Sequence, residues 1–142
     1  MTNNLHKSNL KDIALQIRID IIRSLAEARS GHLGGSLGLA DVFTALYFQM
    51  LNHKPENPGW KDRDRLILSI GHVAPVLYTT LAHAGYFPIE ELLTLRKLGS
   101  RLQGHPGKVH GLPGILRLFL CLIITFPYKV IWYRSIFSLL LD

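Results

Sequence analysis

A glycine-rich loop that carries one histidine, residues 30–41, limits the folds open to this chain more than any other stretch. It reads Ser-Gly-His-Leu-Gly-Gly-Ser-Leu-Gly-Leu-Ala-Asp. Its glycines allow positive φ values and a close approach of the backbone to a ligand, and the imidazole of His32 can donate, accept or carry a proton. We therefore predict a binding loop. Two further Gly-His pairs, at His72 and His105, could bring their loops to the same site.

Amphipathic helices are predicted on both sides of this loop. Apolar residues recur at steps of three and four over residues 10–28 and again over residues 39–51, with charged and polar residues between them. Ser8 or Asn9 would cap the first helix, and Ser36 would cap the second.

A strand, a tight turn and a helix are predicted next. The apolar run 66–68 follows charged residues and precedes a glycine, as in a strand buried on both faces. Pro75 favours the first turn of a helix over residues 74–84. This order is half of a βαβ unit, and in open parallel sheets ligands bind beyond the carboxyl ends of the strands. The pattern indicates an α/β fold and places His72 where chemistry is expected.

A third helical segment, a loop and an apolar tail complete the chain. Pro88 and Glu90 would begin the helical segment, and Arg96 would lie in its last turn, where a cation suits the helix dipole. Residues 100–114 are predicted to form a loop rich in glycine and proline. Residues 116–142 are mostly apolar and show neither a helical nor an alternating period.

Composition and charge exclude several classes of protein. With 48% apolar and 18% charged residues, the chain is predicted to be globular. The net charge of +6 suits anionic ligands, but the basic residues are scattered and form no patch for nucleic acid. The single cysteine, Cys121, permits no internal disulfide, and residues 1–11 lack the apolar core of a signal peptide. We therefore expect a cytoplasmic protein.

Three alternative interpretations stay open from the residues alone. The three histidines could be unrelated residues of loops and helix caps. His105, His110 and Cys121 could hold a metal, although they share only one short spacing. Residues 118–126 could touch a membrane, but they are far shorter than the spanning length of about 20 residues, so no membrane partner is predicted.

Three segments resemble the N-terminal part of transketolases. They are residues 30–37, the stretch Asp-Arg-Leu-Ile-Leu-Ser at 64–69 with the Gly71-His72 pair after it, and Leu-Arg-Lys-Leu-Gly-Ser-Arg-Leu-Gln-Gly-His-Pro at 95–106. The likeness extends over residues 10–115 and is strongest to the N-terminal subunit of split transketolases. It implies that residues 1–115 are the N-terminal part of a thiamine diphosphate-binding domain, a partial α/β fold with helices flanking a short parallel sheet. Residues 116–142 would be a tail foreign to the family.

The resemblance also implies an activity and its site. Transketolases transfer a two-carbon ketol unit between sugar phosphates, using thiamine diphosphate and a divalent metal, usually Mg²⁺. His32 and His105 would face the hydroxyls and the carbonyl oxygen of the substrate, and His72 would lie against the diphosphate of the cofactor and the reacting carbons. A sugar phosphate and a C-terminal transketolase subunit would be the partners, in a family that is dimeric.

Departures from the family pattern indicate an incomplete, inactive fragment. Ile70 stands where split forms carry a polar or basic residue. After Ile115 the glycine-rich stretch that contacts the cofactor is missing, and the chain has no Gly-Asp pair of the kind that holds the metal and the diphosphate. We therefore expect no tight cofactor binding by this chain alone.

A shift of reading frame would explain the composition of residues 116–142. Two other functions remain as alternatives to the transketolase interpretation. The chain could be a non-catalytic remnant that docks on a transketolase subunit, or a small membrane-associated protein.

Overall fold

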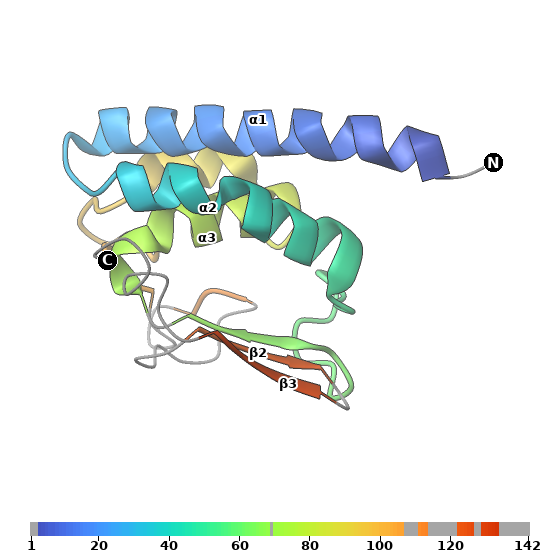
Figure 1. Cartoon of the computed structure of the whole chain (residues 1–142). Coiled ribbons are helices and arrows are strands. Elements are labelled where there is room, and N and C mark those ends of the chain that lie inside the picture. The colour runs from blue at the N-terminus through green and yellow to red at the C-terminus, as the bar shows by residue number, and fades with distance from the viewer. Residues whose placement is uncertain (1–2, 69, 107–110, 114–121, 127–128, 134–142) are drawn as a thin grey trace, which may run out of the picture.

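The computed structural model describes residues 3–68, 70–106, 111–113, 122–126 and 129–133. A layer of helices lies over a small sheet (Figure 1). In chain order the elements are α1 (Asn3–Ala28), α2 (Gly34–Ala45), the π-helix η1 (Leu46–Met50), β1 (Arg65–Ile67), the 3-10 helix η2 (Gly71–Val73), α3 (Ala74–His83), the 3-10 helix η3 (Ile89–Thr94), β2 (Leu122–Phe126) and β3 (Lys129–Tyr133).

The helices on both sides of the glycine-rich loop are confirmed, but their predicted caps are wrong. Helix α1 begins at Asn3, so Ser8 and Asn9 lie inside it. Helix α2 begins at Gly34, and the residue at its N-cap position is Leu33. Ser36 therefore falls within the first turn of α2, where its buried hydroxyl has no hydrogen-bond partner among the described residues. The apolar period gave the helices correctly because burial of one face decides them, whereas the ends depend on contacts outside the helix.

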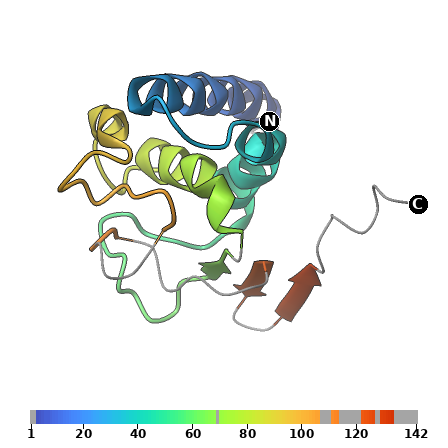
Figure 2. The same ribbon diagram turned by 90° about the vertical axis from the view of Figure 1, so that its left-hand side faces the viewer.

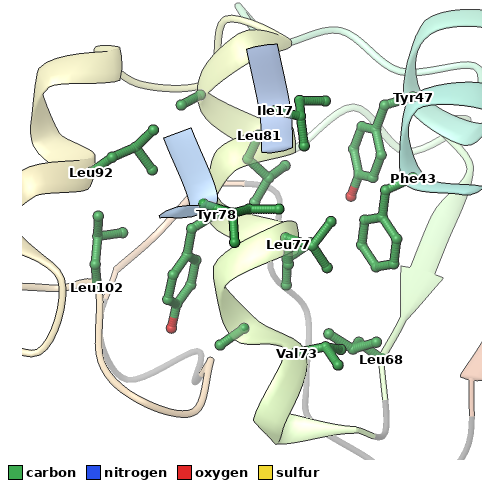
Figure 3. Packing of buried hydrophobic residues seen from close by; sticks show 14 of the residues in the cluster. Ile17, Phe43, Tyr47, Leu68, Val73, Leu77, Tyr78, Leu81, Leu92 and Leu102 are labelled. Carbon is green, nitrogen blue, oxygen red and sulfur yellow. The ribbon is translucent and has the colours of Figure 1, made fainter. Parts of the chain in front are cut away.

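Helix α3 is the most buried element among the described residues. All of its residues from Ala74 to Ala82 are buried, and α1, α2 and η3 surround it (Figure 2). Its side chains interdigitate with those of the neighbouring helices, as Leu77 and Leu81 do between Ile17 and Phe43 (Figure 3). The predicted strand, turn and helix at residues 66–84 are confirmed as β1, η2 and α3.

The sheet is antiparallel throughout its described strands. Its order is β1-β2-β3, with Leu66 opposite Ile124 and Ile124 opposite Ile131. No two of the described strands run parallel, so the short parallel sheet of the sequence analysis stays a prediction.

Strands β2 and β3 lie in the tail that showed no period. Short runs of β-branched and aromatic residues form strands without alternating polarity, which explains why periodicity missed them.

The third predicted helix is shorter than expected. Only Ile89–Thr94 is helical, as the 3-10 helix η3, and Arg96 lies beyond it with a φ of 61°. The backbone N–H of Arg96 donates to the carbonyl of Leu102 at 2.7 Å. This contact turns the chain back on itself and ends the helix before the basic residues that the sequence placed in its last turn.

Two side-chain pairs tie α1 to the neighbouring helices. Arg18 Nη2 lies 2.7 Å from Asp41 Oδ2 on α2. His83 Nε2, on α3, lies 2.8 Å from Asp20 Oδ2 on α1, and both of these side chains are largely buried. The loop that carries His32 joins α1 to α2, so these pairs help to hold its two ends.

The core predicts a clear contrast within α1. Ile17 is fully buried, whereas Leu15 is 53% exposed on the same helix. Ile17→Ala removes buried methyl groups and leaves a cavity, so it should lower the free energy of unfolding by about 2–5 kcal/mol. Leu15→Ala, the matched control, should change it by less than about 0.5–1 kcal/mol. Urea unfolding followed by circular dichroism measures both, and equal losses would contradict the described packing.

The Arg18–Asp41 pair predicts a small dependence of stability on pH. The Arg18 guanidinium, through its hydrogen bond, holds the pKa of the Asp41 carboxyl below its usual value. A carboxyl whose pKa is lowered by folding stabilises the fold above its unfolded pKa of about 4, and this contribution is lost as the pH falls through the lower, folded pKa. Because Asp41 is exposed, the contribution should not exceed about 1 kcal/mol at neutral pH.

Asp41→Asn tests this dependence. The difference in unfolding free energy between the wild-type chain and the variant should be present at pH 7 and absent at about pH 2. Asp62→Asn, which removes an exposed carboxylate elsewhere, serves as the control. A difference for Asp41→Asn that grows in acid would be the wrong sign.

Candidate functional site

The three histidines of the Gly-His pairs lie side by side. The ring centroids of His32 and His72 are 4.9 Å apart, and the two planes meet at 69°. The centroids of His72 and His105 are 5.3 Å apart, at 73°. All three residues are exposed. We call these three residues the histidine cluster. Loops separated by tens of residues therefore converge on one site, as the sequence analysis suggested.

The loop between α1 and α2 positions His32. Gly31 has a φ of +128°, which a residue with a side chain adopts only under strain. After the loop, Gly35 in the first turn of α2 packs against η2, since a Cβ built on it would lie 2.9 Å from Val73 Cγ1. The absence of a side chain at Gly35 lets α2 approach η2, which brings His32 next to His72.

The turn between β1 and α3 positions His72. Gly71 and Val73 of η2 are buried, while His72 between them faces outward. A Cβ built on Gly71 would overlap His105 Cδ2 and lie 3.0 Å from His105 Nε2. Only glycine therefore allows the imidazole of His105 to pack directly on this turn.

The segment before His105 is held from two sides. The Tyr78 hydroxyl on α3 donates to the Gln103 carbonyl at 2.8 Å, and burial raises the pKa of the Tyr78 phenol, so it keeps the proton that it donates. The Leu102 carbonyl accepts from the backbone of Arg96, and the Leu102 side chain is fully buried. These contacts give the His105 loop a defined place beside α3.

A narrow cavity opens beside the histidine cluster. Its lining is made by residues of all three loops and of the core beneath: Leu25, Gly31, His32, His72, Pro75, Leu95, Arg96 and Gly104. Its volume of about 10 Å³ is enough for about one water molecule. Sequence reasoning did not assign Arg96 to this site because it placed that residue in the last turn of a helix. The signal that could have found it is its position inside the 95–106 segment that also carries His105.

The chemistry of the site is that of hydrogen-bond donors near an exposed surface. Imidazoles and a guanidinium can donate to anionic or hydroxyl oxygens. Among the described residues, no three histidines, cysteines or carboxylates are arranged to hold a metal ion. His110 and Cys121 of the alternative metal site lie outside the described residues, so that alternative is untested. The nitrogen donors of the described residues are groups that suit anionic oxygens, such as those of a diphosphate.

The family comparison decides the relationship. Residues 9–115 match the model of the thiamine diphosphate-binding domain of transketolase. The chain belongs to the transketolase family. It is 47% identical over 100 residues to the 6-deoxy-6-sulfo-D-fructose transketolase subunit SqwG of Clostridium sp., covering 67% of this chain and 36% of that protein. It is 42% identical over 100 residues to transketolase 1 of Escherichia coli, covering 70% of this chain and 15% of that enzyme.

A solved structure agrees with the sequence relatives. The transketolase of Leishmania mexicana superposes with a TM-score of 0.72 at 30% identity, over 83% of this chain and 17% of that one. The transketolase-like fold is therefore shared. The chain spans about a third or less of the length of the relatives described above.

One observation bears on the alternative that the chain is a membrane-associated protein. Within the described part of the chain, no helix combines the length and the apolar character needed to cross a membrane.

The packing of Gly71 against His105 predicts a local disruption. Gly71→Ala should displace the His105 ring, because the added methyl group occupies its place. In the NMR spectrum of the histidine rings, we expect His105 and His72 to shift while His53 and His83 stay unchanged. Gly38→Ala adds a methyl group in α2, where no described atom outside the local helix backbone lies within 4 Å, so it should leave all of these signals in place. Unchanged His105 signals in Gly71→Ala would contradict the contact.

Proposed function

We propose that this chain carries the histidine-bearing part of a transketolase active site. In this proposal His32 and His105 face the hydroxyls and the carbonyl oxygen of a sugar phosphate, and His72 lies against the diphosphate of the cofactor. The observation that carries the proposal is the contact of the His72 ring with both His32 and His105 at an exposed surface. The match of residues 9–115 to the thiamine diphosphate-binding domain supports it.

The chemistry of imidazole suits these roles. Transfer of a ketol unit moves protons on and off sugar oxygens, and an imidazole can donate or accept a proton near neutral pH. A neutral or protonated imidazole also donates a hydrogen bond to an oxygen that gains negative charge. Thiamine diphosphate, when bound, supplies the carbanion chemistry of the family. The residues of this chain would bind and orient the sugar and hold the anionic end of the cofactor.

The same proposal holds that the 142-residue chain is not a catalyst by itself. Mg²⁺ that a protein binds together with a diphosphate is held by carboxylate oxygens of the protein and by oxygens of the phosphates. The described residues offer no carboxylates grouped for that purpose, and the chain has no Gly-Asp pair. Further residues, and a C-terminal transketolase subunit that completes the dimeric family's site, would have to supply these ligands. The word "subunit" in the name of the Clostridium relative supports a divided arrangement.

The division of the chain belongs to the same proposal. Residues 1–115 would form the N-terminal part of the domain, in which β1 joins a parallel sheet completed by further strands. The approach of β1 to the His72 turn supports this placement, because ligands bind beyond the carboxyl ends of such strands. Residues 116–142 would be a tail encoded out of frame, and the end of the family match at residue 115 supports that origin. Translation of the coding DNA beyond codon 115 in the other frames tests it: absence of the family's glycine-rich stretch in every frame would refute it.

Titration of the whole chain with thiamine diphosphate and Mg²⁺ tests the proposal. Calorimetry should detect no binding with a micromolar dissociation constant, because the described residues group no carboxylates for the metal. At millimolar cofactor, NMR should show shifts of the ring signals of His32, His72 and His105. His53 and His83 bond to Tyr86 and Asp20 within the fold and act as internal controls.

Two results would contradict the proposal separately. Micromolar binding would show that the chain holds the cofactor without the missing ligands. Shifts at His53 or His83 without shifts in the histidine cluster would place the ligand elsewhere and remove the site assignment.

A further inference from the structure

Arg96 lies between two of the loops that carry the histidine cluster. A Cβ built on Gly104 would lie 3.4 Å from Arg96 Cζ, and one built on Gly31 would lie 3.7 Å from Arg96 Nη1. These glycines directly precede His105 and His32. Arg96 also lines the cavity beside His32 and His72. Its guanidinium therefore sits against the backbone of both loops, on the same side as the cavity.

The charge of Arg96 has no counter-ion in the described part of the chain. The neighbouring basic residues are paired, since Lys97 Nζ lies 2.6 Å from Glu27 Oε1 and Arg101 binds both carboxylate oxygens of Glu91. Arg96 is exposed, and among the described residues no carboxylate or carbonyl accepts a hydrogen bond from its guanidinium. Its five N–H donors are thus available to a ligand.

The backbone of Arg96 is also held in an unusual conformation. Its φ of 61° lies in the left-handed region, where a residue other than glycine, asparagine or aspartate is uncommon. The hydrogen bond from its N–H to Leu102 fixes this conformation. A glycine would adopt it without strain. An arginine at this position therefore points to a function of its side chain that offsets the cost of the backbone conformation. Strain of this kind gathers at ligand-binding sites.

We propose that Arg96 binds a phosphoryl group at the rim of the histidine cluster. This inference rests on the proposed function of the cluster and adds the residue that would supply the permanent positive charge. The planar guanidinium matches two oxygens of a phosphoryl group at once and stays charged at every physiological pH. The cavity holds only about one water molecule, so the phosphoryl group would lie on the outer rim, between the guanidinium and the imidazoles.

The phosphoryl group could belong to the diphosphate of the cofactor or to a sugar phosphate. Both present the same oxygens, and titrations with pyrophosphate, fructose 6-phosphate and fructose separate them. Dependence on Arg96 for pyrophosphate alone assigns the residue to the cofactor, and dependence for fructose 6-phosphate assigns it to the substrate. Fructose, which has no phosphoryl group, should bind equally with or without Arg96.

The test compares the whole wild-type chain with Arg96→Gln and with Arg101→Gln as the matched control. Ring signals of the histidine cluster report binding. Arg96→Gln should weaken the binding of pyrophosphate or fructose 6-phosphate at least about tenfold, because a charge-assisted pair is lost. Arg101→Gln removes an equal charge that Glu91 already neutralises, so it should change this affinity less than about twofold.

A measurement on the wild-type chain keeps the test independent of the folding of the variants. Phenylglyoxal modifies accessible arginines, and pyrophosphate or fructose 6-phosphate should protect Arg96 from it while leaving Arg23 reactive. Lack of protection would overturn the inference. Equal shifts of the cluster in the wild-type chain and Arg96→Gln would also overturn it, yet would leave the proposed function of the histidines intact. No shift in either chain would contradict phosphoryl binding altogether, and the proposed function would then depend on the titration with thiamine diphosphate.

Discussion

The burial of helix α3 is the interaction on which the rest of the structure depends. Every residue from Ala74 to Ala82 is enclosed by α1, α2 and η3. Such a helix cannot shift or rotate without opening voids in a close-packed interior. Its N-terminal end follows directly on η2, which carries His72, and its Tyr78 hydroxyl holds the segment before His105. The positions of two of the three histidines therefore follow from the packing of one helix.

The third histidine is placed by a contact that only small residues permit. Gly35 lets the first turn of α2 lie against Val73, and His32 lies two residues before that turn. Gly35 and Gly71 thus permit close packing because they have no side chain. Gly31 contributes in a different way, by adopting a positive φ. The cluster combines exposed imidazoles with a rigid base, which is the arrangement that a precise binding site needs.

Much of this arrangement could be predicted from the sequence, for identifiable reasons. Apolar periodicity predicted α1 and α2, because burial of one face imposes it, and Pro75 indicated the first turn of α3. The Gly-His pairs pointed to His32, His72 and His105, and the structure brings these residues together. The roles assigned to them are still proposals.

The features that the sequence analysis missed depend on contacts that no periodic pattern encodes. The hydrogen bond from Arg96 to Leu102 shortens the third helix and moves the arginine to the cavity. The pairing of β1 with β2 gives structure to a tail that has no period of its own. The Arg96 turn overrides the helical preference of its segment, and the pairing of β1 with β2 joins segments that meet only after folding, so neither has a periodic signal in the sequence.

The candidate site offers nitrogen donors rather than carboxylates. The described residues hold nitrogen donors, which suit hydroxyl and phosphoryl oxygens, and they hold no group of carboxylates for a metal. The chain also spans a minor share of the length of its relatives. Under the proposed function, this chain recognises anionic and hydroxyl groups of the ligands through these nitrogen donors.

The central claim is that three separate loops bring their histidines into contact in the folded chain. Nuclear Overhauser effects between histidine rings, measured on the whole chain with ¹³C-labelled histidine, test it most directly. The account predicts cross-peaks from the His72 ring to both His32 and His105, since ring centroids 4.9 and 5.3 Å apart place their protons within range. A folded chain in which His72 shows cross-peaks to neither ring would contradict the account.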